Sequence, residues 1–166
     1  MNEEIEVSKK RPGGLTALGV LSMVSIGFSF IGTLIGLLSG KVSEEEMLEQ
    51  SVQMAEAKSE MRKLGMESWT RIYDQLEAMS IQANESIYLA GFLGIVVSAT
   101  GLAGVLMMWK GRKIGFHIYI IYCLIALGSA YLYISPANIP TIVTIVSVVF
   151  SGLFILLYAR NLRWMK

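Results

Sequence analysis

Apolar residues are concentrated in four long stretches of the 166-residue chain, and polar residues fill the segments between them. The apolar stretches cover residues 15–39, 86–109, 114–135 and 139–159, and none of them contains Asp, Glu, Lys or Arg. An α-helix rises about 1.5 Å per residue, so each stretch is long enough to cross a hydrocarbon core about 30 Å thick. The pattern predicts four transmembrane helices.

The segment 40–85, between the first two spans, has the pattern of two amphipathic helices. Ser43 and the glutamates after it fit a capping box, and Arg62–Gly65 fits a helix stop, with basic residues followed by glycine. Ser68 is the expected N-cap of the second helix. The apolar residues of that helix recur at steps of three and four: Trp69, Ile72, Leu76, Met79 and Ala83.

Both ends of this segment must return to the same membrane surface. An antiparallel helical hairpin with its turn at Gly65–Glu67 meets that requirement, and it is the arrangement we expect. The alternative is that the second helix lies in the membrane interface with Trp69 toward the lipid.

The composition agrees with a membrane protein and excludes a nucleic-acid-binding domain. Hydrophobic residues make up 54% of the chain and charged residues 16%, whereas soluble domains have about 25% charged residues. The net charge is +1, and the basic residues form short flanks beside the apolar stretches rather than one extended patch. The length fits one membrane domain, residues 1–166.

The basic flanks predict how the chain is oriented in the membrane. Three basic residues precede the first span, three join the second and third spans, and three follow the fourth: Lys9, Lys10, Arg11, Lys110, Arg112, Lys113, Arg160, Arg163 and Lys166. Segment 40–85 has ten acidic residues against five basic ones, and the last connection has no basic residue. The positive-inside rule therefore places both termini in the cytoplasm and segment 40–85 outside. The expected fold is an all-α, four-transmembrane-helix bundle with an extracytoplasmic helical hairpin.

Small residues form a ridge on each of the first two spans. The two ridges consist of Ser25, Ser29, Gly32 and Gly36 in the first span and of Gly91, Gly94, Ser98 and Gly101 in the second. If the spans run antiparallel, the two ridges match in register, with Gly36 opposite Gly91 and Ser25 opposite Gly101. Small residues let membrane helices approach closely, so we expect these eight residues to form a helix-packing contact. The alternative is that either ridge binds a second subunit.

Residues that could carry chemistry are few. The spans contain no carboxylate, and His117, the single histidine, lies four residues from Lys113 at the end of its span. This pattern gives no nucleophile beside a base and no proton relay, so no enzyme activity and no cofactor are expected. The alternative is that His117 meets a serine from another span, whereas we expect a histidine at the headgroup level. Cys123 is the single cysteine and is expected to be a packed core residue. A tyrosine-rich face of span three, with Tyr119, Tyr122 and Tyr133, favours a helix interface over a conduit.

Methionines recur every seven residues in the first helix of segment 40–85, at Met47, Met54 and Met61. Thioethers suit Cu(I), but no His or Cys accompanies them in this segment, so no metal site is expected. Methionine is also common on adaptable binding surfaces. The candidate partner surface consists of Met47, Met54, Met61, Trp69, Ile72 and Leu76.

Two patches carry a resemblance to known proteins. They are Arg11-Pro12-Gly13 followed by Leu15-Thr16, and Trp109-Lys110 followed by Lys113-Ile114-Gly115-Phe116 and Tyr119. Together they resemble a loose set of uncharacterised small four-pass membrane proteins from Bacteroidota bacteria. The resemblance implies a bacterial inner membrane and no particular activity.

The function that these observations favour is non-catalytic. We expect a structural or accessory subunit that binds a protein partner or its own copies within the lipid bilayer. The alternative is a small channel or transporter-like permeation protein, and an enzyme ranks third. No nucleic acid is expected as a partner.

Overall fold

The computed structural model describes residues 12–165, and all regular structure among them is helical. The α-helices are α1 (Gly13–Ser39), α2 (Glu44–Lys63), α3 (Glu67–Glu85), α4 (Ile87–Trp109), α5 (Ile114–Ser129) and α6 (Thr141–Ala159). Two short 3-10 helices, η1 (Ala130–Leu132) and η2 (Pro136–Asn138), connect α5 to α6. The prediction of an all-α protein is confirmed.

Four helices among the described residues are long and apolar enough to cross a membrane: α1, α4, α5 with its extension η1, and α6. They coincide with the predicted spans, apart from shifts at their ends. The third span ends at Leu132 rather than Ser135, and α6 begins at Thr141 rather than Ile139. Ser135 and Ile139 each precede a proline, which disfavours the helical conformation at that residue, and both have extended ψ angles, of 133° and 115°.

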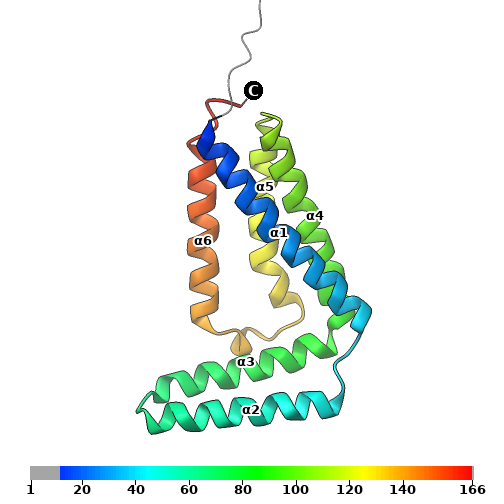
Figure 1. Ribbon diagram of the computed structural model, residues 1–166, viewed down its shortest axis with the longest axis vertical. Helices are drawn as coiled ribbons and strands as arrows, with labels where there is room; N and C mark the ends of the chain where they lie inside the picture. The colour runs from blue at the N-terminus through cyan, green and yellow to red at the C-terminus, as the bar shows by residue number, and fades with distance from the viewer. Residues whose placement is uncertain (1–11, 166) are drawn as a thin grey trace, which may run out of the picture.

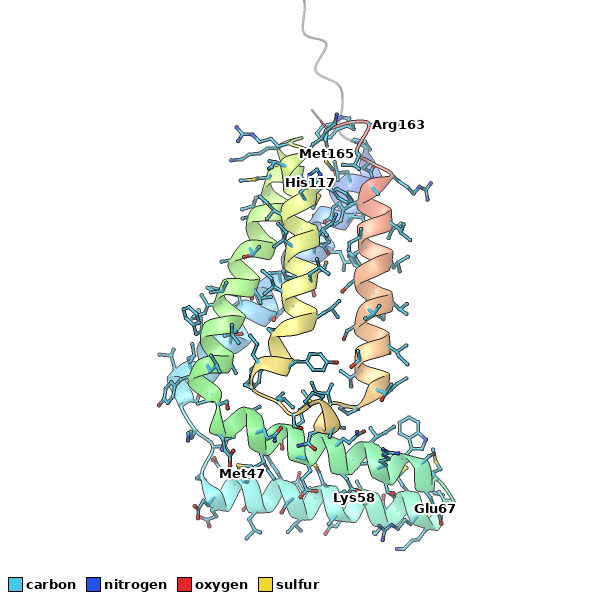
Figure 2. The ribbon with its side chains drawn as sticks, turned by 180° about the vertical axis from the view of Figure 1, so that it is seen from behind. Met47, Lys58, Glu67, His117, Arg163 and Met165 are labelled. Carbon is cyan, nitrogen blue, oxygen red and sulfur yellow. The ribbon has the colours of Figure 1, made fainter. Side chains whose placement is uncertain are left out.

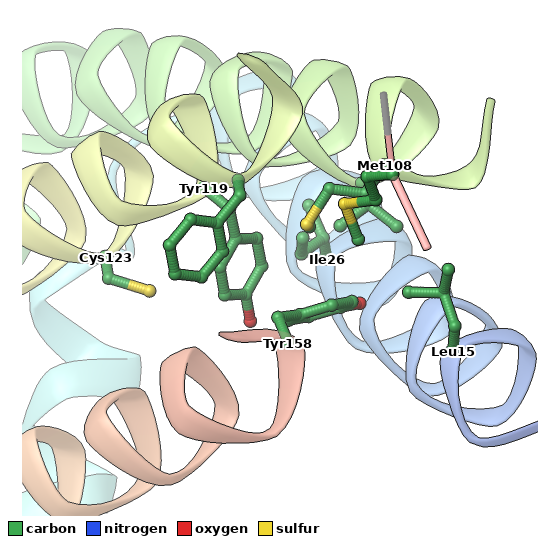
Figure 3. Close-up of a cluster of buried hydrophobic side chains, with 9 residues drawn as sticks. Leu15, Ile26, Met108, Tyr119, Cys123 and Tyr158 are labelled. Carbon is green, nitrogen blue, oxygen red and sulfur yellow. The ribbon is translucent and has the colours of Figure 1, made fainter. Parts of the chain in front are cut away.

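The four long helices run along the long axis of the molecule (Figure 1). Helices α4 and α5 lie antiparallel and α1 packs along α4. Helix α6 lies beside α1 at the end that carries the C terminus and diverges from it toward the other end (Figure 1). The buried core is therefore at the C-terminal end of the bundle, where Leu15, Met108 and Tyr158 pack together (Figure 3).

Two glycines bring the backbones of α4 and α5 into contact. A Cβ atom on Gly115 would lie 2.5 Å from the backbone nitrogen of Met108 and 2.6 Å from the carbonyl oxygen of Gly104. A Cβ atom on Gly104 would lie 2.9 Å from the backbone nitrogen of Tyr119. No other residue type fits at these two positions without a backbone shift, so the pair sets how closely α4 and α5 approach.

Helices α2 and α3 lie antiparallel, across the end of the bundle that is opposite the C terminus (Figure 1). The predicted capping box is present, with the Glu46 amide donating to Ser43 Oγ at 3.2 Å and the Ser43 amide to Glu46 Oε2 at 3.3 Å. The predicted stop is also present, because α2 ends at Lys63 and Gly65 has a φ of 72°. Lys58 then joins the two helices through ion pairs of 2.7 Å to both Asp74 and Glu77.

The expected N-cap of the second helix is wrong. Helix α3 begins at Glu67, and its N-cap is Met66, which makes no side-chain cap hydrogen bond. The Met66 amide instead donates to the Met61 carbonyl at 2.9 Å, which closes the turn around Gly65 through the backbone. Ser68 therefore lies inside the first turn of α3, and the bond from the Met66 amide satisfies a carbonyl in the last turn of α2.

Candidate functional site

A buried hydroxyl pair holds α6 against α1 at the C-terminal end of the bundle. Tyr158 has no exposed surface, and its hydroxyl donates to Ser22 Oγ at 2.9 Å. The Tyr158 ring also packs edge-on against Tyr119 of α5, with ring centroids 4.9 Å apart (Figure 3). This contact joins three helices at one level.

Two cavities lie where α6 diverges from its neighbours, and they meet at Phe150 and Ser151. The first, of about 290 Å³, lies between α1, α5 and α6. The second, of about 410 Å³, lies between α5 and α6 and reaches Met79 of α3. We call the two together the α6 cleft.

The first cavity of the α6 cleft is lined by neutral polar groups from three helices. These groups are the hydroxyls of Ser22, Ser25, Tyr119, Tyr122 and Ser151 and the thiol of Cys123. The rest of its lining is apolar, with Ile26, Phe150 and Phe154. Such a lining fits an apolar occupant that also offers neutral hydrogen-bonding groups, and it offers no formal charge to bind an ion.

A contact between η1 and α6 lies in the lining of the second cavity of the α6 cleft. The Tyr131 hydroxyl of η1 lies 3.1 Å from Thr144 Oγ1 of α6 and bridges the two helices. Ile139 and Val143 complete this part of the lining. Among residues 12–165 no group of three or more His, Cys, Asp or Glu side chains is placed to hold a metal ion.

A third cavity, of about 480 Å³, lies where α1 and α4 meet α2 and α3. Asn84 of α3 forms part of its wall and holds the α1–α2 connection. Its side chain accepts from the Val42 amide at 2.8 Å, donates to the Val42 carbonyl at 3.2 Å and lies 3.0 Å from the sulfur of Met47. These bonds tie the start of α2 to the end of α3.

The predicted ridge on α4 packs against α1, but it meets a different face of α1 from the one expected. Gly91, Ser98 and Gly101 are buried and Gly94 is half-buried, whereas Ser25, Ser29 and Gly32 are exposed and Gly36 is half-buried. The residues of α1 that enter the α4 ridge are Leu37 at Gly91, Thr33 at Gly94 and Ile26 at Gly101. The antiparallel register is close to the predicted one, and α1 is rotated by about one residue.

This rotation has a packing reason. A row of glycines leaves a groove on the surface of a helix, because glycine has no side chain. The side chains of the facing helix fill such a groove best. Two facing ridges of small residues would leave fewer atoms in contact and less dispersion energy. On α1, a Cβ atom at Gly32 or Gly36 would meet nothing within 4 Å. The small residues of α1 therefore form an exposed ridge, which begins at Ser25 on the rim of the α6 cleft.

The candidate partner surface on α2 also differs from the expectation. Met47, Met54 and Met61 are half-buried, and Met47 and Met54 line a hollow together with Glu77 and Ile81 of α3. Their spacing of seven residues is the signature of a seam between two paired helices, and this signal was present in the sequence. Leu48 borders the same hollow but is largely exposed, and Val52 is exposed on the outward face of α2. On α3, Trp69 is exposed and Ile72 and Leu76 are half-buried.

The remaining candidates lie at both ends of the bundle. His117 is exposed at the end of the bundle that also carries Arg163 (Figure 2), and its Nδ1 lies 3.2 Å from the Lys113 carbonyl. Tyr119 and Tyr122 line the α6 cleft, whereas Tyr133 lines the third cavity. The tyrosine face predicted for the third span is therefore divided between two cavities, because Tyr133 lies beyond α5, at the end of η1.

Sequence reasoning missed several residues that position the cleft. They are Gly104, Gly115, Phe150, Ser151 and Tyr158. The two glycines carried a signal, since glycine inside a span indicates close packing. The roles of the other three depend on which way α6 faces, and its composition does not indicate that.

Comparison of the chain with protein-family models, curated proteins and solved structures finds no match. The resemblance to small four-pass proteins of Bacteroidota therefore stays a prediction. The function proposed below depends on the geometry of this chain alone.

Proposed function

We propose that this protein is a non-catalytic, multi-pass integral membrane protein that acts as an accessory subunit and binds a transmembrane helix of a partner protein. The binding site is the α6 cleft together with the exposed ridge of Ser25, Ser29 and Gly32 on α1. One observation carries this proposal: in the described part of the chain Ser25, Ser29 and Gly32 of α1 are exposed, and the ridge they form begins on the rim of a hydroxyl-lined cavity.

Membrane chemistry favours a helix as the occupant. Lipid tails are as apolar as leucine, so helices associate through close packing of small residues and through interhelical hydrogen bonds. The exposed ridge supplies the small residues, and the α6 cleft supplies neutral hydroxyls from three helices. A partner helix at this face of the molecule would contact both the exposed ridge and the hydroxyls of the α6 cleft.

We place the protein in a bacterial inner membrane, with both termini in the cytoplasm and with α2 and α3 outside. The described basic clusters support this orientation, because the α4–α5 turn and Arg163 lie at one end of the bundle, opposite α2 and α3 (Figures 1 and 2). Lys9, Lys10, Arg11 and Lys166 lie outside the described residues. A cysteine introduced at Glu56 should react with an impermeant maleimide in intact cells, and one at Gly111 should not.

A matched pair of variants tests the binding site. Gly32→Leu and Gly27→Leu introduce the same side chain into α1, and a Cβ atom at either position meets nothing within 4 Å. Gly32 lies on the exposed ridge and Gly27 on another face of α1. Each variant is expressed at the level of the unmodified protein and purified in mild detergent, and its co-purifying proteins are quantified.

We expect one stoichiometric partner with the unmodified protein and with Gly27→Leu, and its loss with Gly32→Leu. Retention of the partner by Gly32→Leu would exclude the ridge as the contact. If the co-purifying chain is a second copy of this protein, detected with two different tags, the partner is the protein itself.

A second candidate function is permeation, and the hydroxyl-lined first cavity of the α6 cleft favours it. Ser22, Tyr119 and Ser151 reach that cavity from three different helices, as a narrow polar conduit requires. Purified protein in lipid vesicles should then pass small solutes, and Ser151→Leu should block the passage by filling the cavity. Vesicles that are no leakier than protein-free vesicles would rule this function out.

A further inference from the structure

Helix α3 lies at the level where the spans enter the membrane. Ser86 alone separates α3 from α4, which begins at Ile87. From that point α3 runs across the end of the bundle rather than away from it (Figure 1). The long helices cross the membrane along their own axes, so a helix that lies across their ends runs along the membrane surface.

Contacts on two opposite sides fix how α3 is rotated about its own axis. Toward the bundle, Gln75 Nε2 donates to the Ala137 carbonyl at 2.9 Å and Gln82 Oε1 accepts from the Ser135 amide at 2.9 Å. Away from the bundle, Asp74 and Glu77 pair with Lys58 of α2. Helix α2 therefore covers the outer side of α3, and the bundle covers part of the inner side.

The apolar stripe of α3 continues beyond the bundle. Its C-terminal part is covered, since Met79 lines the α6 cleft and Ala83 lines the third cavity. Its N-terminal part, with Trp69 and Ile72, precedes Gln75, whose side chain makes the first hydrogen bond from α3 to the bundle. Trp69 lies six residues before Gln75, which is about 9 Å along the helix. Trp69 is 48% exposed, although it belongs to the same stripe.

We propose that the N-terminal half of α3 lies in the headgroup region of the membrane that the long helices cross, with Trp69 and Ile72 anchored among the lipids. The stripe is continuous with the surface of α3 that faces the bundle, and lipid surrounds the bundle at that level. Indole rings prefer this level because they combine an apolar body with a polar N–H group. An amphipathic helix held in this way buries its apolar face about 5–10 Å into the boundary between headgroups and acyl chains.

Spin labels at two positions of equal exposure test this inference. Trp69→Cys places a label on the stripe, and Val52→Cys places one on the outward face of α2, where the native side chains are 48% and 51% exposed. Both variants carry Cys123→Ser, which removes the single native cysteine. The full-length protein is reconstituted into phosphatidylcholine vesicles, and collisions of each label with oxygen and with a water-soluble nickel chelate are measured.

We expect the label at position 69 to collide more with oxygen than with nickel, at a depth near the headgroup boundary, and the label at position 52 to show the reverse. Equal nickel access at both positions would mean that α3 is held away from the membrane, which overturns the inference. Shielding of position 69 from both reagents would mean that protein rather than lipid covers Trp69, which also overturns it. Neither result depends on whether a partner helix occupies the α6 cleft.

Discussion

The two ends of the four-helix bundle differ in how their helices meet. At the C-terminal end, Leu15, Met108 and Tyr158 are each at most 1% exposed. The Ser22–Tyr158 hydrogen bond joins α1 to α6 there, and Tyr119 of α5 packs against the Tyr158 ring. At the end near α3, α1 and α6 are far apart (Figure 1), and a cavity of about 410 Å³ separates α5 from α6. The helices are therefore packed together more completely at the C-terminal end, which we call the closed end, than at the end near α3, which we call the open end.

Under the proposed function, the closed end contributes folding stability and the open end contributes the binding surface. When the membrane helices of one chain are fully packed against one another, only their lipid-facing sides can contact a partner. An open end leaves small residues and hydroxyls at the surface, where another helix can use them. Substitutions at the closed end should therefore reduce folding stability, whereas matched substitutions at the open end should have little effect on it.

The largest effect is expected at the contact between α4 and α5. Gly115→Ala adds a Cβ atom 2.5 Å from the Met108 backbone nitrogen, so the two helices must separate. Overpacking of this kind costs about 1–3 kcal/mol. Thermal unfolding in detergent should occur at a clearly lower temperature.

Gly128→Ala is the control on the same helix, because a Cβ atom there meets nothing within 4 Å. Alanine is also the better helix former, so the Tm should stay unchanged or rise slightly. Equal Tm losses for Gly115→Ala and Gly128→Ala would mean that the two ends of α5 are packed equally tightly. That result would contradict the difference between the two ends of the bundle.

A smaller effect is expected from the buried hydroxyl pair. Tyr158→Phe removes the donor to Ser22 and leaves a serine that is 3% exposed without that bond. Interhelical hydrogen bonds in membrane proteins contribute about 0.6 kcal/mol and at most about 1.7 kcal/mol. A double-mutant cycle with Ser22→Ala should give a coupling energy in this range.

The matched cycle at the open end uses Tyr131→Phe and Thr144→Val. The Tyr131 hydroxyl lies 3.1 Å from Thr144 Oγ1, but Tyr131 is 43% exposed. A coupling energy near zero is expected there. A coupling at this end as strong as the Tyr158–Ser22 coupling would show that α5 and α6 are held together as firmly near α3 as near the C terminus.

The attachment of α3 to the bundle depends on two exposed side-chain hydrogen bonds. Gln75→Ala combined with Gln82→Ala removes the bonds to the Ala137 carbonyl and the Ser135 amide. Hydrogen bonds of this kind contribute about 0.5–1.5 kcal/mol each, and both of these are exposed. Amide exchange in the α5–α6 connection should become faster, while exchange in α4 stays unchanged. Unchanged exchange in the connection would mean that these bonds do not hold α3 in place.

The smallest effect concerns the ion pairs of α2 and α3. Hydrogen bonds from Lys58 to Asp74 and Glu77 raise the pKa of Lys58 above its ordinary value of 10.5. The resulting stabilisation is complete below pH 10.5 and is lost as the pH rises through the raised pKa. Lys58→Met should cost about 0.5 kcal/mol at neutral pH, since Asp74 is largely exposed. Amide hydrogen exchange in α2 measures this cost. If the protection of the α2 amides against exchange is already lost at pH 8, the pH dependence arises from a group other than Lys58.

The amino-acid sequence by itself determined the local features of this protein. The four apolar stretches, the capping box at Ser43 and the stop at Gly65 all depend on residues close together in the chain, and the structure has each of them. Helix length, caps and turns follow from backbone hydrogen bonding and local sterics, so nearby residues suffice to predict them.

Only the tertiary structure decided which face of each helix points inward. Thr33 and Leu37, not Gly32 and Gly36, meet the glycines of α4, and α6 diverges from α1. In water, the apolar face of a helix identifies its buried side, but lipid is as apolar as a protein core. The sequence of a span therefore carries little information about its inward face. The contacts of α3 with the α5–α6 connection likewise join residues about sixty positions apart, and no local pattern predicts them.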